Sequence, residues 1–234
     1  MNNAKEIVAA SGRAFIKDLT RCLPLGSTAV AIYEELQSKQ IERKIHRLEE
    51  FYRNVAATVN ALEEKINQEY ISKDDFLDVF EEATRYVILE RLEKKRTLFK
   101  NILANSIISK ECDYDKTERY FRLLDNLSEI ELKILAVLDN PTEYNSSLGM
   151  LIPDTNQDPR QTGMVLFTKS GVLTQLLDMK IHEVTDAVTI LFSNGLVVEQ
   201  FMDDPIHYNG NPVRALNNLL TTRGKDFVNF LKEV

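Results

Sequence analysis

The chain has 234 residues, of which 44% are hydrophobic, and this apolar content excludes wholesale disorder. Its 36 acidic residues outnumber its 29 basic residues and give a net charge of −7. The longest uncharged stretch near the N-terminus, residues 22–33, has only 12 residues, so no membrane-spanning helix is expected there.

The first predicted element is a basic amphipathic helix in the N-terminal segment. Its apolar face consists of Val8, Phe15, Leu19 and Leu23. We expect this helix to pack on the neighbouring helices. The alternative is that it lies on a membrane surface, which would make the protein a membrane-active effector. The segment is charged and lacks the apolar core of a signal peptide, and the two cysteines, Cys22 and Cys112, fit no metal or redox spacing, so we expect a cytoplasmic protein with reduced thiols.

A long antiparallel helical hairpin, similar to a coiled coil, is predicted next. Residues 27–109 contain neither glycine nor proline, so no strong helix breaker interrupts them. The apolar spacing alternates between four and three, as in a helix packed lengthwise on another, at Ile41, Ile45, Leu48, Tyr52, Val55, Val59, Leu62 and Ile66. We predict one helix over residues 28–70, an N-cap at Ser72 and a second helix to residue 108, within a first domain of residues 1–124. The second helix is expected to bury Phe76, Phe80, Ala83, Val87, Leu92, Phe99 and Ile102.

Two basic stretches, residues 39–47 and 90–100, each carry a net charge of +3. If the hairpin closes near residue 71, position 43 faces position 100 and position 47 faces position 96. The candidate partner-binding residues of this basic collar are Arg43, Lys44, Arg47, Lys94, Lys95, Arg96 and Lys100. The alternative is that these residues form solvated helix faces with weak ion pairs between successive turns.

A second domain, residues 125–234, is predicted to be a winged helix, which makes the whole chain mainly α with a C-terminal α+β domain. Ser128 and Glu131 form a helix-start signature, and the first helix stops before Pro141. Helices over residues 168–179 and 182–194 follow, then strands over 196–202 and 213–222 and a final helix over 223–234. Residues 142–166 form an unusually long insertion between the first two helices.

Charge argues against DNA binding by this domain. Residues 125–234 hold eight Lys and Arg against fifteen Asp and Glu, a net charge of −7. DNA affinity depends largely on basic residues that replace counterions at the phosphates. We therefore expect the domain to dock a protein. The alternative is a DNA-binding transcription regulator, whose recognition helix would use Thr185, Asp186 and Thr189 or which would bind through the basic helices.

No catalytic, cofactor-binding or metal site is predicted. The alternating Asp154, Asn156 and Asp158 begin like a calcium loop, but proline stands where the loop needs glycine. A loop with Asp203, Asp204 and His207 is expected to be solvated. The sequence contains no phosphate-binding loop, dinucleotide fingerprint, zinc motif or nucleophile elbow.

The block "LEKKRTLFKNILANSIISKECDYDKTERYFRLLDNLSEIELKILAVLDNP" resembles the abortive-infection alpha group of bacterial proteins linked to phage defence. The matching motifs are "NILAN" at residues 101–105 and the "LS..E..IL" pattern at 127–135. The resemblance spans residues 30–140 and implies a bacterial or phage setting, without catalytic residues. The sequence thus predicts a non-enzymatic interaction or regulatory protein with a protein partner, and homo-oligomer formation remains open.

Overall fold

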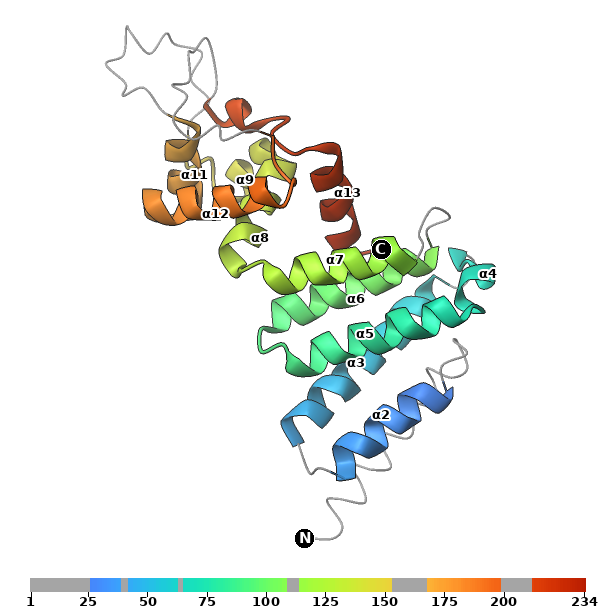
Figure 1. Ribbon diagram of the computed structural model, residues 1–234. Helices are drawn as coiled ribbons and strands as arrows, with labels where there is room; N and C mark the ends of the chain where they lie inside the picture. Colours follow the sequence, from blue (N-terminus) through green and yellow to red (C-terminus); the bar gives the residue numbers. More distant parts are fainter. Residues whose placement is uncertain (1–25, 39–41, 63–64, 109–113, 153–167, 199–211) are drawn as a thin grey trace, which may run out of the picture. The chain divides into compact units, whose positions relative to one another are not determined.

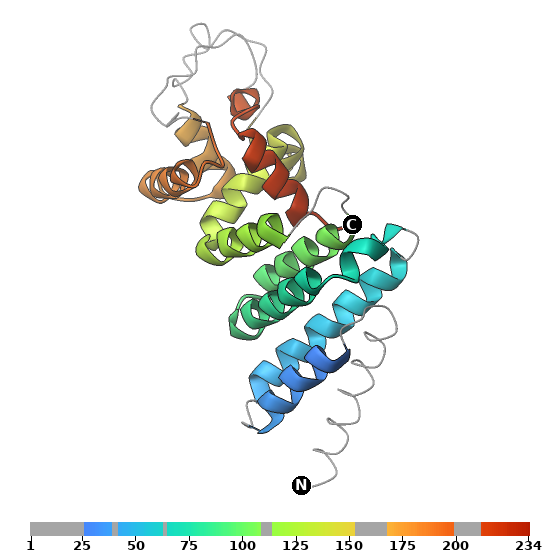
Figure 2. The ribbon, with the colours of Figure 1, turned by 45° about the vertical axis from the view of Figure 1, so that its right-hand side comes forward.

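The computed structural model describes residues 26–38, 42–62, 65–108, 114–152, 168–198 and 212–234 (Figures 1 and 2). Within these ranges the chain is mainly helical, which confirms the mainly α part of the predicted fold class but not its C-terminal α+β domain. The predicted N-terminal amphipathic helix, both cysteines, most of the 142–166 insertion and the predicted loop with Asp203, Asp204 and His207 lie outside the described residues. None of the helices in the described ranges is both long and apolar enough to cross a membrane.

The chain forms two compact units. Unit 1 combines Met1–Asp125 with Phe230–Val234, and unit 2 comprises Asn126–Asn229. The sequence placed the last five residues in the second domain, whereas their contacts assign them to unit 1. Besides the last residues of the chain, unit 1 contains the helices α2 (Gly26–Ser38), α3 (Glu42–Ala61), α4 (Gln68–Ile71), α5 (Asp74–Leu89), α6 (Glu93–Ile108) and α7 (Tyr114–Asn126).

The core of unit 1 is built around α3, which packs against both α5 and α6. Helices α3, α5, α6 and α7 lie side by side in both views (Figures 1 and 2). The predicted apolar seam is confirmed for its six members from Ile45 to Leu62, which are buried. Ile66 is half-buried beyond the end of α3, and Ile41 lies outside the described residues. Aromatic rings contribute to this core: Tyr52 of the seam stacks on Phe80 of α5, with 5.4 Å between the ring centroids.

The prediction of two long helices is wrong. Instead of continuing into α3, helix α2 packs against it, and the Tyr33 hydroxyl donates to the Glu49 carboxylate at 3.0 Å. The second predicted helix is divided into α5 and α6 at residues 90–92. Glu90 is extended, and its carboxylate accepts a hydrogen bond from the Leu92 N–H at 2.8 Å. The absence of glycine and proline permits a continuous helix without enforcing one.

Two details of the predicted hairpin change with this break. Ser72 follows α4 as its C-cap, and α5 begins at Asp74 without a side-chain cap from the preceding Lys73. Leu92, which was expected to be buried, is 47% exposed because it lies in the connection between α5 and α6. The other apolar positions expected to be buried in this part of the chain are buried, from Phe76 to Ile102.

Unit 2 has a core of three helices that pack on one another, α8 (Glu129–Asp139), α11 (Lys169–Leu177) and α12 (Ile181–Ser193). The predicted start of the first one is confirmed, because Ser128 and Glu131 form a capping box. Gly195, with φ of +68°, follows the third helix and occupies the left-handed conformation that glycine adopts at helix ends. The elements of unit 2 are α8 (Glu129–Asp139), α9 (Pro141–Ser147), α11 (Lys169–Leu177), α12 (Ile181–Ser193), the 3-10 helix η2 (Pro212–Leu216) and most of α13 (Thr222–Leu231).

The predicted strands of the winged helix are replaced, among the described residues, by one isolated antiparallel bridge between Val197 and Leu220. The Val198 N–H donates to the Leu219 carbonyl at 2.8 Å. The strand predicted over 213–222 is wrong at its beginning, where η2 forms. Residues three apart share one side of a 3-10 helix, and this geometry buries both Val213 and Leu216.

Candidate functional site

The first candidate site is a groove between α3 and α6 in unit 1. Arg47 and Arg96, which the sequence placed opposite each other, line the same groove together with Glu50 and Glu93. The part of the groove that Arg43 also lines has a volume of about 530 Å³. The groove carries both signs of charge, so it is not a uniform anion-binding surface.

Arg47 and Arg96 donate hydrogen bonds to acceptors within unit 1. Arg47 Nη1 donates to the carbonyl oxygens of Ile88 and Leu89 at 3.0 and 3.3 Å, at the end of α5. Arg96 donates to the Arg91 carbonyl at 3.0 Å and to Glu50 Oε2 at 3.3 Å. The last carbonyls of a helix have no donor within the helix, so Arg47 stabilises the point at which α5 ends.

Lys95 and Lys100, two further residues of the basic collar, are each only 8% exposed. Lys95 Nζ donates to the Asp125 carbonyl at 2.8 Å and lies 3.5 Å from the Glu90 carboxylate. Lys100 Nζ lies 3.4 Å from the Glu233 carboxylate. Together with Arg47 and Arg96, these two lysines make four cations of the collar that have partners inside unit 1.

The remaining collar residues are Arg43, Lys44 and Lys94. Arg43 and Lys94 are exposed and Lys44 is half-buried. None of the three has an ion-pair partner within the described ranges. They are the members of the collar whose charge stays available to a partner.

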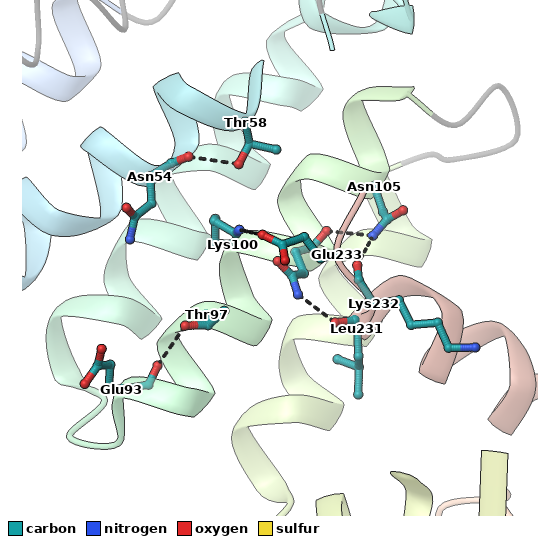
Figure 3. A network of polar contacts seen from close by, with 10 residues as sticks. Asn54, Thr58, Glu93, Thr97, Lys100, Asn105, Leu231, Lys232 and Glu233 are labelled. Carbon is teal, nitrogen blue, oxygen red and sulfur yellow. Dashed lines mark hydrogen bonds and ion pairs between the residues drawn. The ribbon is translucent and has the colours of Figure 1, made fainter. Parts of the chain in front are cut away.

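A second candidate site is the face of α6 that holds the C-terminal segment, residues 230–234 (Figure 3). Asn101 Nδ2 donates to the Leu231 carbonyl at 2.7 Å. Asn105 Nδ2 donates to the carbonyls of Phe230 and Lys232 at 3.2 and 3.0 Å. We refer to Asn101 and Asn105 as the amide clamp. Helix α13 ends at Leu231, so the clamp supplies donors to carbonyls that lack them within the helix.

The ring of Phe230 gives the C-terminal segment an aromatic anchor. Tyr120 of α7 lies with its ring centroid 4.9 Å from that of Phe230, at an interplanar angle of 58°. The Lys116 ammonium lies 5.3 Å from the centroid of the same ring. Tilted aromatic pairs and cations over ring faces are both favourable arrangements. The segment is thus held through its main chain by α6 and through one side chain by α7.

Sequence reasoning found the clamp residues only as the two ends of the "NILAN" motif and assigned them no role. A physical signal for them was present. Asparagine is unfavourable inside helices because its side chain competes for backbone hydrogen bonds. Two asparagines four residues apart, enclosing an apolar triplet, occupy one face of a helix. Their spacing indicates that this face supplies hydrogen-bond donors to a neighbouring group.

A third group of titratable side chains lies on α5 and α7. Burial raises the pKa of Glu82, and the neighbouring carboxylate of Glu118 raises it further, while Arg122 lowers it. Tyr86 shares a hydrogen bond with Glu82, and burial also raises the pKa of this phenol. No group of three metal-ligating side chains occurs among the described residues. The pair of carboxylates therefore lacks a third ligand, within those ranges, that would hold a metal ion.

The predicted recognition helix is α12 of unit 2. Thr185 donates its hydroxyl to the Ile181 carbonyl at 2.8 Å, and Thr189 donates to the Thr185 carbonyl at 2.9 Å. Asp186 is exposed. The same helix leaves Ile181, Ile190 and Phe192 exposed by 50, 43 and 42% and contains no lysine or arginine. It thus presents apolar and acidic groups to its surroundings.

Comparisons of this chain with protein-family models, with curated proteins and with solved structures each found no match. The resemblance to the abortive-infection alpha group therefore stays a prediction from the two short motifs that carry it.

Proposed function

We propose that this chain is a non-enzymatic interaction protein whose unit 2 docks a protein partner through the exposed face of α12. The observation that carries the proposal is the composition of that face. Ile190 exposes a large apolar side chain one turn after Asp186, and Phe192 exposes another on the opposite flank of the helix, which contains no basic residue. Exposed apolar side chains that gather on one element are typical of protein-binding surfaces.

The architecture proposed for unit 2 is that of a modified winged helix. Helices α8, α11 and α12 pack together, and only residues 178–180 separate α11 from α12. Asp178 adopts the left-handed conformation in this turn, with φ of 51°. A three-residue turn between two helices is typical of helix-turn-helix motifs. The bridge between Val197 and Leu220 stands where the base of the wing is expected.

The partner proposed for α12 has an apolar surface with basic residues at its edge. Residues 126–229 hold seven Lys and Arg against thirteen Asp and Glu, a net charge of −6. This charge repels phosphate and attracts a basic protein surface. The weak resemblance to the abortive-infection alpha group adds the proposal that the partner belongs to a bacterial or phage setting.

The alternative function is a DNA-binding regulator, which is favoured by the short turn between α11 and α12. In that case Thr185, Asp186 and Thr189 would face the base edges. Two of these residues already donate to carbonyls of their own helix, so they would have to act as acceptors or exchange partners. The membrane-active alternative depends on the first helix, and liposome flotation tests it.

The proposed site is tested by a photo-crosslinking amino acid introduced at His182, which is exposed on α12. The control position is Gln175, which is exposed on α11. The captured partner is then purified, and its affinity is measured by calorimetry. We expect Ile190→Asp with Phe192→Asp to weaken binding at least about tenfold, since central apolar contacts dominate interface energies. The control Gln175→Asp should not change it.

Two results would contradict the proposal. One is a partner that binds the double variant and the parent chain equally well. The other is specific binding of duplex DNA at physiological salt that is lost in Thr185 and Thr189 variants, which would establish the alternative.

A further inference from the structure

The C-terminal segment is bound to unit 1 in a way that resembles a ligand in a site. Two side-chain amides, Asn101 and Asn105, donate to three consecutive main-chain carbonyls of the segment. All these contacts lie within unit 1. Main-chain carbonyls are common to every helix end, so the clamp recognises the shape of a helix end and not a particular sequence.

The side chains of the segment add selectivity to this shape. The ring of Phe230 contacts the ring of Tyr120 and lies 5.3 Å from the Lys116 ammonium. Three residues later, Glu233 meets the Lys100 ammonium at 3.4 Å. A ligand of this site therefore needs an aromatic residue in the last turn of a helix and an acidic residue just beyond it.

The polarity of the site distinguishes it from an ordinary interior contact. Asn101 and Lys100 are 5% and 8% exposed, and each has a polar contact with the segment. Asn101 Oδ1 is a buried acceptor without a donor among the described residues. Permanent protein interiors are mainly apolar, because a buried polar group without a full set of hydrogen-bond partners lowers stability. Surfaces that bind and release partners are more polar.

We propose that the face formed by α6 and α7 is a binding site for the C-terminal turn of an amphipathic helix, which the chain's own residues 230–234 occupy as an intramolecular ligand. A partner helix with the same aromatic and acidic spacing binds by displacing this segment. The site is separate from α12 and does not depend on the function proposed for that helix.

The direct test uses the full-length chain with its own segment disabled by Phe230→Asp. The probe is a fluorescein-labelled peptide with the sequence of residues 222–234. Fluorescence anisotropy should show binding about tenfold tighter than to the parent chain, because the tethered segment of the parent competes at a high effective concentration. Adding Asn101→Leu and Asn105→Leu should remove this binding. Asn54→Leu changes an exposed asparagine of α3 and serves as the matched control, which should bind as before.

A second measurement covers the case in which Phe230→Asp lowers the helix content seen by circular dichroism. In the unaltered chain, hydrogen exchange of the amides of residues 230–234 is followed with and without a large excess of unlabelled peptide. Displacement predicts several-fold faster exchange with the peptide and no change with a scrambled one. Equal anisotropy for the folded variant, the parent and the clamp variant would overturn the proposal, and so would exchange that the peptide leaves unchanged.

Discussion

Gly171 and Gly224 form a matched pair for testing how closely unit 2 is packed. Each is the third residue of its helix, and its N–H donates to a threonine hydroxyl three residues earlier, at 3.0 and 2.9 Å respectively. A Cβ at Gly171 would lie 3.2 Å from the Thr168 hydroxyl oxygen, which belongs to a side chain. A Cβ at Gly224 would lie 2.0 Å from the Leu196 carbonyl oxygen, which belongs to the backbone.

The two alanine variants should therefore differ in stability. Gly224→Ala must move the Leu196 carbonyl, which also accepts from the Thr221 N–H at 3.1 Å. Overpacking costs about 1–3 kcal/mol and a lost hydrogen bond about 1 kcal/mol, whereas the helix propensity of alanine returns at most about 1 kcal/mol. We expect Gly224→Ala to lower the free energy of unfolding by about 2 kcal/mol, and Gly171→Ala to change it by less than about 0.5 kcal/mol.

The assay is urea unfolding followed by circular dichroism, with hydrogen exchange to assign the transition to unit 2. The midpoint for Gly224→Ala should fall while the slope stays the same, because only stability changes. Equal midpoints for the two variants would refute the close approach of α13 to Leu196.

Three further predictions test unit 1. Leu48 is fully buried in α3, so Leu48→Asp should unfold this unit, since an uncompensated buried charge costs roughly 3–5 kcal/mol; unchanged thermal unfolding would show that the seam is exposed. Arg47→Ala removes hydrogen bonds at the end of α5 and should cost about 1 kcal/mol in urea titrations, whereas Arg43→Ala should cost less than about 0.5 kcal/mol. Burial and Glu118 raise the pKa of Glu82, so the folded chain keeps this proton to a higher pH than the unfolded chain. Stability should fall as pH rises from the unfolded pKa through the folded one, and Glu82→Gln should lack this part of the pH dependence.

The periodic part of the fold could be predicted from the sequence because burial repeats with the helix. The seam from Ile45 to Leu62 is buried as its spacing requires. The break between α5 and α6 could not be predicted in this way. It depends on Glu90, which accepts from a nearby N–H, and on Arg47, which reaches carbonyls more than forty residues along the chain. Hydrogen bonds of this kind produce no periodic pattern in the sequence.

The basic collar shows a similar limit. The register that places Arg47 level with Arg96 follows from where the chain reverses, and both residues do line one groove. Their hydrogen-bond partners are carbonyl groups and one carboxylate of unit 1. Whether a cation faces a partner or its own backbone depends on side-chain placement, which charge counts do not contain. The clamp asparagines were missed for the same reason, since their acceptors lie in the last residues of the chain.

The central claim is that α12 binds protein through its apolar and acidic face. It is tested most directly by hydrogen exchange of the full-length chain with and without the purified partner captured through His182. We predict slower exchange in the amides of Ile181–Ser193 on binding and no such protection from genomic duplex DNA at physiological salt. Protection of α12 by DNA, or a protein complex that leaves the exchange of α12 unchanged, would contradict the claim.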